Sequence, residues 1–263
     1  MANTFIGGDS FSFLGAGGCC VNCCNVCCGV ITVGLGTGSS IRCAANNNAS
    51  GCYSTALGRF NTSSGNYAGT FAGECNFGCG KYSVVTNGCC NTSSGDYSFI
   101  GGGKLNLASC TYSFVGAGFC NVSSGCASST LSGSYNTASA YYGSVSGGYQ
   151  NTASGNYAQI IGGHSNVASA CHSFVGVGDF NTSAGNESII LGGCCNLACG
   201  GFSLISNGFC NSASGLYASI NNGICHTASG NYSFTGNGIC NTASDYSSHI
   251  SGGFGNTASG CYT

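Results

Sequence analysis

The sequence predicts an all-β fold, a parallel β-solenoid with 15-residue coils and no helix. The first observation is a repeat close to N-T-A-S-G-x-Y-S-x-I-x-G-G-x-C, which starts at Asn61 and returns every 15 residues. The second is that β-branched and aromatic residues occupy fixed positions of this repeat, as strands favour. The third is that no stretch shows helical periodicity. A fixed period of this length is typical of a solenoid, and about seventeen coils stacked ~4.8 Å apart would give a rod of ~80 Å.

The repeat keeps a strict register when each unit is numbered from its Asn. Position 1 is Asn in every unit except one, where His226 replaces it. Position 13 is Gly from Gly73 to Gly253, and position 10 is always Thr, Val or Ile. Equivalent residues are therefore expected at equivalent places in successive coils.

Positions 7 to 11 of each unit predict one short strand, as in the segment Tyr97-Ser98-Phe99-Ile100. Alternation places positions 8 and 10 inside the coil and positions 7, 9 and 11 outside. Position 8 is Ser, Ala or Gly in every complete unit, so with the small residues at positions 3 and 4 it predicts a thin interior filled mainly by position 10. The Gly-rich positions 5 and 13 and the Asn at position 1 are expected at corners with positive φ.

The chain divides into two parts. Residues 1–45 are interpreted as degenerate N-terminal coils with a cysteine cluster, because the segment Phe5-Ile6-Gly7-Gly8 matches positions 9 to 12 of the repeat. Residues 46–263 are predicted to form one continuous solenoid of 14- or 15-residue coils.

A resemblance to a known family rests on residues 48–58 and on the segment Gly162-Gly163-His164-Ser165-Asn166-Val167-Ala168-Ser169. These resemble the head repeats of YadA-like trimeric autotransporter adhesins, and similar repeats occur in fibre proteins of phages and giant viruses. The resemblance covers roughly residues 46–263 and implies a left-handed parallel β-roll, often with three chains side by side. The sequence lacks the adhesins' signal peptide, heptad stalk and membrane-anchor barrel, which favours a fibre over a cell-anchored adhesin.

Composition argues against several classes of function. The chain has four Lys and Arg residues and a net charge of −2, which gives no electrostatic footprint for nucleic acid. No apolar run approaches the roughly 18 residues that a membrane span needs, so no membrane insertion is expected. The six acidic residues are scattered, and the four His residues occupy different repeat positions. We therefore expect no enzyme, no cofactor and no metal site.

The 23 cysteines favour an oxidised location outside the cell, namely an extracellular appendage or a virion surface. In the N-terminal cluster they are expected to cross-link subunits, with metal binding through its C-x-x-C spacing as the alternative. Position 15 forms a second column, in which bridges such as Cys195–Cys210 and Cys225–Cys240, or bridges between chains, are feasible. The alternative is that these thiols stay reduced. The candidate residues are Cys19, Cys20, Cys23, Cys24, Cys27, Cys28, Cys75, Cys90, Cys195, Cys210, Cys225 and Cys240.

Aromatic residues at position 7 form an exposed column, for which two interpretations stay open. Burial against a neighbouring chain would make this column a lateral interface, because soluble monomers seldom expose long apolar stripes. Alternatively, the rings stack on one another with their hydroxyls in water. The residues concerned are Tyr67, Tyr82, Tyr97, Tyr112, Tyr157, Tyr217 and Tyr232.

The predicted function is a structural subunit of a self-assembling, disulfide-reinforced β-solenoid fibre, whose partner is the chain itself, with a trimer as one form. Phe5 and Ile6 of one copy are expected to complete the coil that ends at Tyr262 and Thr263 of another, which would stack copies head to tail. The alternative is an adhesin-like or ice-binding module, since Thr-x-Ser recurs at positions 2 and 4.

Overall fold

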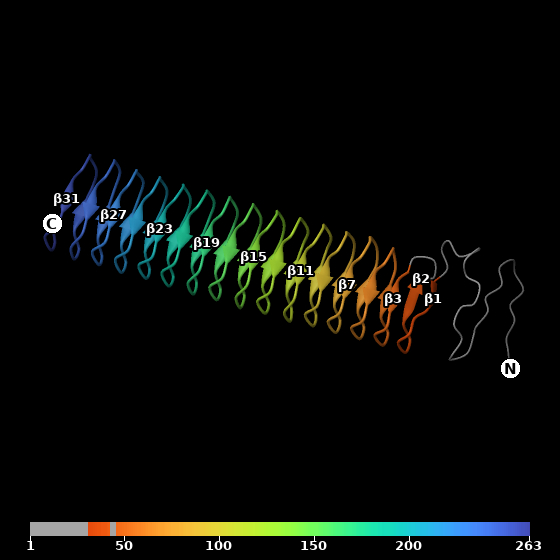
Figure 1. The fold of residues 1–263 in the computed structure, drawn as a ribbon. Helices are drawn as coiled ribbons and strands as arrows, with labels where there is room; N and C mark the ends of the chain where they lie inside the picture. The colour runs from red at the N-terminus through yellow and green to blue at the C-terminus, as the bar shows by residue number, and fades with distance from the viewer. Residues whose placement is uncertain (1–30, 43–45) are drawn as a thin grey trace, which may run out of the picture.

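The computed structural model describes residues 31–42 and 46–263, and these residues form a long rod of stacked coils (Figure 1). The described residues contain no helix and build two sheets, one of 16 strands and one of 15. Successive coils add one strand to each sheet in turn, and their pairing is parallel throughout the repeats. The predicted fold class, an all-β parallel solenoid with coils of about 15 residues, is confirmed.

Each regular coil contributes a two-residue strand at positions 9–10 to the first sheet and another at positions 2–3 to the second. The first sheet contains β1 (Ile31–Val33), β2 (Ser40–Arg42), β4 (Thr55–Ala56), β6 (Gly69–Thr70), β8 (Val84–Val85), β10 (Phe99–Ile100), β12 (Phe114–Val115), β14 (Ser129–Thr130), β16 (Ser144–Val145), β18 (Gln159–Ile160), β20 (Phe174–Val175), β22 (Ile189–Ile190), β24 (Leu204–Ile205), β26 (Ser219–Ile220), β28 (Phe234–Thr235) and β30 (His249–Ile250). The second contains β3 (Asn48–Ala49), β5 (Thr62–Ser63), β7 (Phe77–Gly78), β9 (Thr92–Ser93), β11 (Leu107–Ala108), β13 (Val122–Ser123), β15 (Thr137–Ala138), β17 (Thr152–Ala153), β19 (Val167–Ala168), β21 (Thr182–Ser183), β23 (Leu197–Ala198), β25 (Ser212–Ala213), β27 (Thr227–Ala228), β29 (Thr242–Ala243) and β31 (Thr257–Ala258).

The register between coils follows the sequence repeat without slippage. Phe99 pairs with Phe114 and Ile100 with Val115, which are 15 residues apart. A third line of single bridges joins position 14 of successive coils, from Arg59 to Phe254, so each coil is tied to the next on three sides. The one antiparallel pair in the described residues is β1 with β2, at the N-terminal edge of the first sheet.

The predicted strand at positions 7–11 is wrong in its bounds. Position 7 is not extended: its residues have φ near +55°, as do those at position 15. The Gly at position 13 also has positive φ, but the Gly at position 5 and the Asn at position 1 do not, so two of the three expected corners are wrong. A coil this short has to turn sharply between straight segments, and this closure overrides the β-propensity of Tyr.

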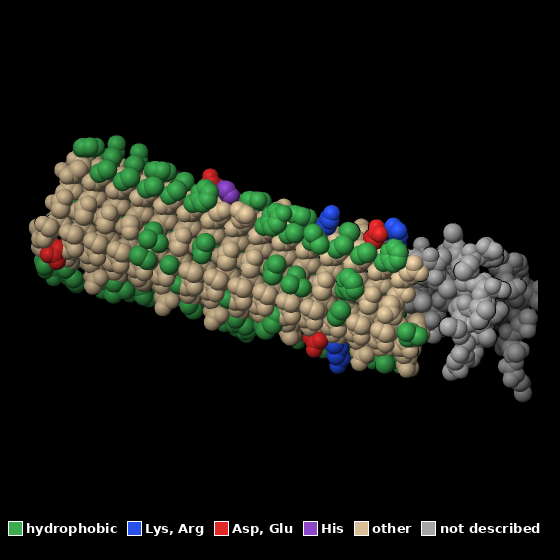
Figure 2. Space-filling view, viewed as in Figure 1, with side chains coloured by type: hydrophobic (Ala, Val, Ile, Leu, Met, Phe, Trp, Pro, Cys, Tyr) green, Lys and Arg blue, Asp and Glu red, His purple; other side chains and the backbone are tan. Residues whose placement is uncertain are grey.

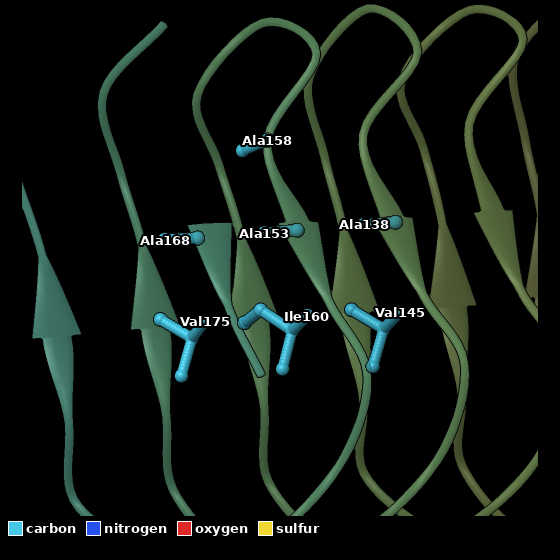
Figure 3. Close-up of a cluster of buried hydrophobic side chains, with 7 residues drawn as sticks. All are labelled: Ala138, Val145, Ala153, Ala158, Ile160, Ala168 and Val175. Atoms are coloured by element: carbon cyan, nitrogen blue, oxygen red, sulfur yellow. The ribbon is translucent and has the colours of Figure 1, made fainter. Parts of the chain in front are cut away.

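The core is thin and is built from both sheets. Figure 3 shows Val145, Ile160 and Val175 of the first sheet beside the small Ala138 and Ala153 of the second. Position 10 is buried in the repeats and position 8 likewise, as predicted, whereas position 4 lies outside. Burying an Ile side chain contributes roughly 1.5–3 kcal/mol, so position 10 supplies most of the hydrophobic stabilisation of a coil.

A buried ladder of asparagines occupies the remaining interior corner. Asn151 is fully buried, and its Nδ2 donates to the carbonyl oxygens of Gly147 at 3.0 Å and Gly163 at 2.9 Å. Its Oδ1 accepts from the backbone N–H of Asn166 in the next coil at 3.0 Å. The same pattern recurs along the rod, so position 1 links each coil to the next through its side chain. The sequence analysis predicts this Asn at a corner with positive φ and does not predict the hydrogen-bonded ladder, so the prediction for position 1 is wrong.

Candidate interaction surfaces

The position-7 column is exposed and forms a ladder of stacked rings along one edge of the rod, here called the tyrosine ladder. Tyr53, Tyr67, Tyr82, Tyr97 and Tyr112 stack in sequence, with ring centroids 4.8–5.2 Å apart. These rings keep between 39% and 62% of their surface exposed. The left-handed backbone points each side chain outward, and the coil spacing then brings neighbouring rings to stacking distance. The expected outward position of the column is confirmed, and its burial against a neighbouring chain stays a prediction.

The ladder continues over the middle and C-terminal coils in shorter stretches. Tyr142, Tyr157 and His172 stack in one stretch and Phe202, Tyr217 and Tyr232 in another. Between them, Glu187 takes the place of a ring, and a shallow depression is lined by His172, Phe174, Glu187 and Ile189. This depression offers one carboxylate and one imidazole on an open surface.

A second edge carries cysteines at position 15 beside apolar residues at position 14. Figure 2 shows hydrophobic side chains gathered along the long edges of the rod, densely toward its C-terminal end. Over the last coils this edge contains no charged residue. We call these residues the cysteine edge: Cys194, Cys195, Phe209, Cys210, Ile224, Cys225, Ile239, Cys240 and Phe254.

The cysteines at position 15 are not bonded to one another. Cys195, Cys210, Cys225 and Cys240 are exposed free thiols, and Cys75 and Cys90 are half-buried free thiols. The disulfide within the described residues joins Cys110 and Cys126, whose Cα atoms lie 5.0 Å apart. This pair was missed because the expected bridges joined cysteines 15 residues apart, whereas the bonded pair is 16 residues apart.

Cys194 and Cys195 form a vicinal pair at the start of the cysteine edge. The Sγ atoms of Cys194 and Cys195 lie 3.2 Å apart. The hydrogen bond to Cys195, together with desolvation, raises the pKa of Cys194 to about 11. At neutral pH this thiol therefore carries little thiolate, the form that reacts with disulfides.

The other predicted site residues fall in two groups. The cysteines from Cys19 to Cys28, together with Phe5 and Ile6, lie outside the described residues. At the other end, the backbone N–H of Tyr262 donates to the carbonyl of Tyr246, and the carbonyl of Thr263 accepts from His249. These two residues therefore continue the coil pattern.

His226 interrupts the asparagine ladder. It is fully buried, and its Nδ1 accepts from the backbone N–H of Asn241 at 3.1 Å, as an Asn Oδ1 would. Its Nε2 is buried without a hydrogen-bond partner. Gly223 beside it has φ +141°, the largest of the positive φ values among the described glycines, and a Cβ there would lie 2.1 Å from the His226 Nε2. Burial lowers the pKa of His226 below its ordinary value of about 6.5.

We expect the substitution His226→Asn to stabilise the rod and to remove an acid-sensitive step. An Asn restores the donor to the carbonyls of Asn222 and Gly238, which we expect to add about 1–3 kcal/mol. The unfolded His226 takes up a proton below pH about 6.5, whereas the folded one resists it, so wild-type stability is complete above that pH and falls as the pH drops below it. Urea unfolding at pH 8 and pH 5 measures both effects.

The matched control for this experiment is His249→Asn, because His249 is exposed. Among the described residues the buried side chains contain no other titratable group. A loss of stability between pH 8 and pH 5 that persists in the His226→Asn variant would show that the acid sensitivity originates elsewhere.

The described residues show few groupings of chemically active side chains. They contain no cluster of three or more His, Cys, Asp or Glu residues arranged to hold a metal ion. The ion pair in this part of the chain joins Arg59 to Glu74 at 3.0 Å on the surface. No helix able to span a membrane occurs in residues 31–42 and 46–263.

Comparison with known proteins adds no relative to this picture. No protein-family model matches the chain. No curated protein matches it either.

Proposed function

We propose that this chain is a structural subunit of a β-solenoid fibre that assembles from copies of itself. The observation that carries the proposal is the placement of the large apolar side chains. Among the described residues no Tyr, Phe or Leu is buried, and the core is made of Ala, Val and Ile. Large side chains that cannot enter a thin core gather on the surface in columns, and contiguous apolar surface of this extent marks an interaction site.

The regular backbone supports assembly along the axis. Within residues 61–253, each coil presents the same bridges at positions 2–3, 9–10 and 14. A second copy stacked on the rod would continue these ladders, in a heterologous contact that does not close into a ring. Lateral contacts through the tyrosine ladder would then thicken the fibre, with trimers as one form.

The cysteines support a covalently reinforced fibre outside a reducing compartment. The described residues carry 14 free cysteines, none of which is buried. Exposed thiols at this density are compatible with oxidation between subunits on an extracellular appendage or a virion surface. The likeness of the repeat to adhesin heads and viral fibre proteins belongs to the same proposal.

Negative-stain microscopy of the full chain, with and without reductant, tests the proposal. We expect long fibres of uniform width under oxidising conditions that resist denaturant until they are reduced. Discrete rods of ~80 Å under both conditions would overturn it.

A second candidate, an ice-binding module, is favoured by one observation. Thr residues at position 2 stand outside the second sheet in register, as in the run Thr227, Thr242 and Thr257. This array is interrupted by Phe77, Leu107, Val122, Val167 and Leu197. Thermal hysteresis in a freezing assay would favour an ice-binding module over a fibre, and the absence of thermal hysteresis would rule out the ice-binding function.

A further inference from the structure

The cysteine edge differs from the rest of the rod in combining thiols and apolar side chains without charge. Phe209, Ile224 and Ile239 are 40–47% exposed at position 14. Each lies directly before an exposed cysteine at position 15. Further toward the N-terminus the same position-14 column is interrupted by charged residues, namely Arg59, Glu74, Lys104 and Asp179. The edge is therefore a local patch rather than a general property of the repeat.

The thiols of this patch are poorly placed to bond within one chain. Residues at the same position of adjacent coils have parallel Cα–Cβ directions, so their Cβ atoms keep the coil spacing of ~4.8 Å. A disulfide needs Cβ atoms about 3.5–4.5 Å apart. The bonded cysteines Cys110 and Cys126 do not share a repeat position, because they lie at positions 5 and 6 of adjacent coils. The cysteines that share position 15 in the patch are all free: Cys195, Cys210, Cys225 and Cys240. The column is left available to an external thiol.

We propose that the cysteine edge is the contact between two antiparallel copies of this chain, closed by disulfides from Cys210 to Cys225 and from Cys195 to Cys240 of the other copy. The proposal rests on the self-assembly proposed above and names the surface and partner of one lateral contact. A two-fold axis between the coils of Cys210 and Cys225 generates each of these two bridges twice, which gives four disulfides in the pair. All four can form together because both copies have the same coil spacing. Phe209 then faces Ile224 of the second copy.

The antiparallel arrangement follows from the charges on the same edge. In a parallel pair each residue would face its own copy, so Arg59 would meet Arg59 and Glu74 would meet Glu74. Like charges brought together at an interface are unfavourable. The antiparallel arrangement places Phe209 against Ile224 and Cys194 against Ile239, and it leaves Arg59, Glu74 and Lys104 outside the contact. Asp179 lies at its margin, opposite Phe254 of the other copy.

The size of the patch explains why the contact would be covalent. A stable interface usually involves about 20–30 residues and ~800 Å² from each partner. The cysteine edge contributes nine side chains on a narrow ridge, well below that size. Apolar contact would align the two copies only briefly, and disulfide formation would make the pair permanent.

The bond-forming chemistry requires an oxidant, which we take to be a small-molecule disulfide such as oxidised glutathione. The thiolate of one cysteine attacks this disulfide and releases one small-molecule thiol. The thiolate of the facing cysteine then displaces the second small-molecule thiol and forms the interchain bond. Two protein thiols are oxidised and one disulfide is reduced to two thiols. Desolvation and the neighbouring thiols of Cys195 and Cys225 raise the pKa of Cys210, so the reaction should accelerate as the pH rises.

The test mixes ¹⁴N- and ¹⁵N-labelled full-length chains, oxidises them with oxidised glutathione and maps the disulfides by mass spectrometry. We expect mixed-isotope peptides that join Cys210 to Cys225 and Cys195 to Cys240. Peptides that join Cys210 to Cys210 would overturn the antiparallel contact. Bonds from Cys195 to Cys210 that carry a single isotope would overturn the interchain contact altogether.

Two variants separate the edge from thiols in general. Replacing Cys195, Cys210, Cys225 and Cys240 with Ser should abolish these dimers, whereas replacing Cys75, Cys90 and Cys120, at the same repeat position, should leave them unchanged. The exposed Ile224→Asp should slow dimer formation about tenfold, which corresponds to 1.4 kcal/mol, because it puts a charge in the apolar contact. The exposed Leu131→Asp on another face is the control. Equal rates in both Asp variants would overturn the role of the apolar side chains.

The outcome also separates this contact from fibre formation. Fibres that persist in the four-serine variant with no loss of lateral order would overturn the proposed contact through the cysteine edge and leave the proposed function intact. Mapped Cys210–Cys225 dimers in a protein that forms no fibres would support this contact and overturn the proposed fibre function.

Discussion

The variant Gly163→Ala is expected to lose about 3–5 kcal/mol of stability and to open the rod at the coil that contains it. Gly163 has φ +92°, and a Cβ there would lie 2.0 Å from the carbonyl oxygen of Gly178. That oxygen is backbone of the next coil and cannot move without breaking the bridge beside it. The new methyl would also press on the Nδ2 of Asn166 at 2.7 Å, which belongs to the asparagine ladder. Urea unfolding and amide hydrogen exchange measure the loss and its place.

The neighbouring Gly162→Ala is the matched control for this variant. A Cβ at Gly162 meets no atom within 4 Å, and its φ is not in the left-handed region. Position 12 also holds Ala117 and Val177 in other coils. We expect a change within about 0.5 kcal/mol. If both substitutions destabilise equally, close packing at position 13 is not the reason for its glycines.

The variant Asn151→Ala is expected to destabilise the rod by about 3–5 kcal/mol, because it removes four side-chain hydrogen bonds from an interior corner. The carbonyl of Gly147 loses its donor, the carbonyl of Gly163 loses one of two donors, and the backbone N–H of Asn166 loses its acceptor. The Gly163 carbonyl still accepts from the backbone N–H of Tyr149, but the Gly147 carbonyl and the Asn166 N–H are left without a partner, which costs more than the bond itself contributed. The measurement is the shift of the urea unfolding midpoint with the slope held constant.

Asn156→Ala serves as the control in the same coil. Asn156 lies at position 6, is exposed and makes no side-chain hydrogen bond to another described residue. Its replacement should change stability by less than about 0.5 kcal/mol. If Asn151→Ala proves as mild as this control, water must replace the ladder at little cost, and the ladder does not hold the coils together.

The fold class was predictable because the repeat itself encodes it. A strict period with Ser or Ala at position 8 and Ile or Val at position 10 determines which face is buried. This part of the prediction is confirmed by Ile160 and Ala158, both fully or almost fully buried. The inference needs only alternation along one segment and identical neighbours above and below.

The turn geometry was not predictable in the same way. Tyr has a high β-propensity, so Tyr97 was expected in a strand, yet its φ is +57°. The left-handed conformation at Tyr97 is required for the coil to close, and closure depends on all 15 residues of the coil together. Asn151 shows the same limit, because a buried Asn is favourable only when the coils above and below supply its partners. A single unit of the repeat does not contain that information.

The candidate surfaces were predictable in part. The sequence predicts the outward column at position 7, because residues of one type repeat there. The disulfide between Cys110 and Cys126 depends on how adjacent coils stack, and the repeat alone does not predict it. The same holds for the burial of His226 and its hydrogen bond to Asn241 in the next coil.

The three lines of bridges between coils have a mechanical consequence. Because each coil contacts only its neighbours, a pulling force along the axis acts on one coil at a time, and resistance resides in the outermost coil rather than in the whole rod. Each coil that detaches releases 15 residues of chain, or about 50 Å of slack. Such a rod yields in many small, equal steps and absorbs work over a distance several times its own length. The Cys110–Cys126 disulfide ties one coil to the next, so under oxidising conditions that slack stays locked within the rod.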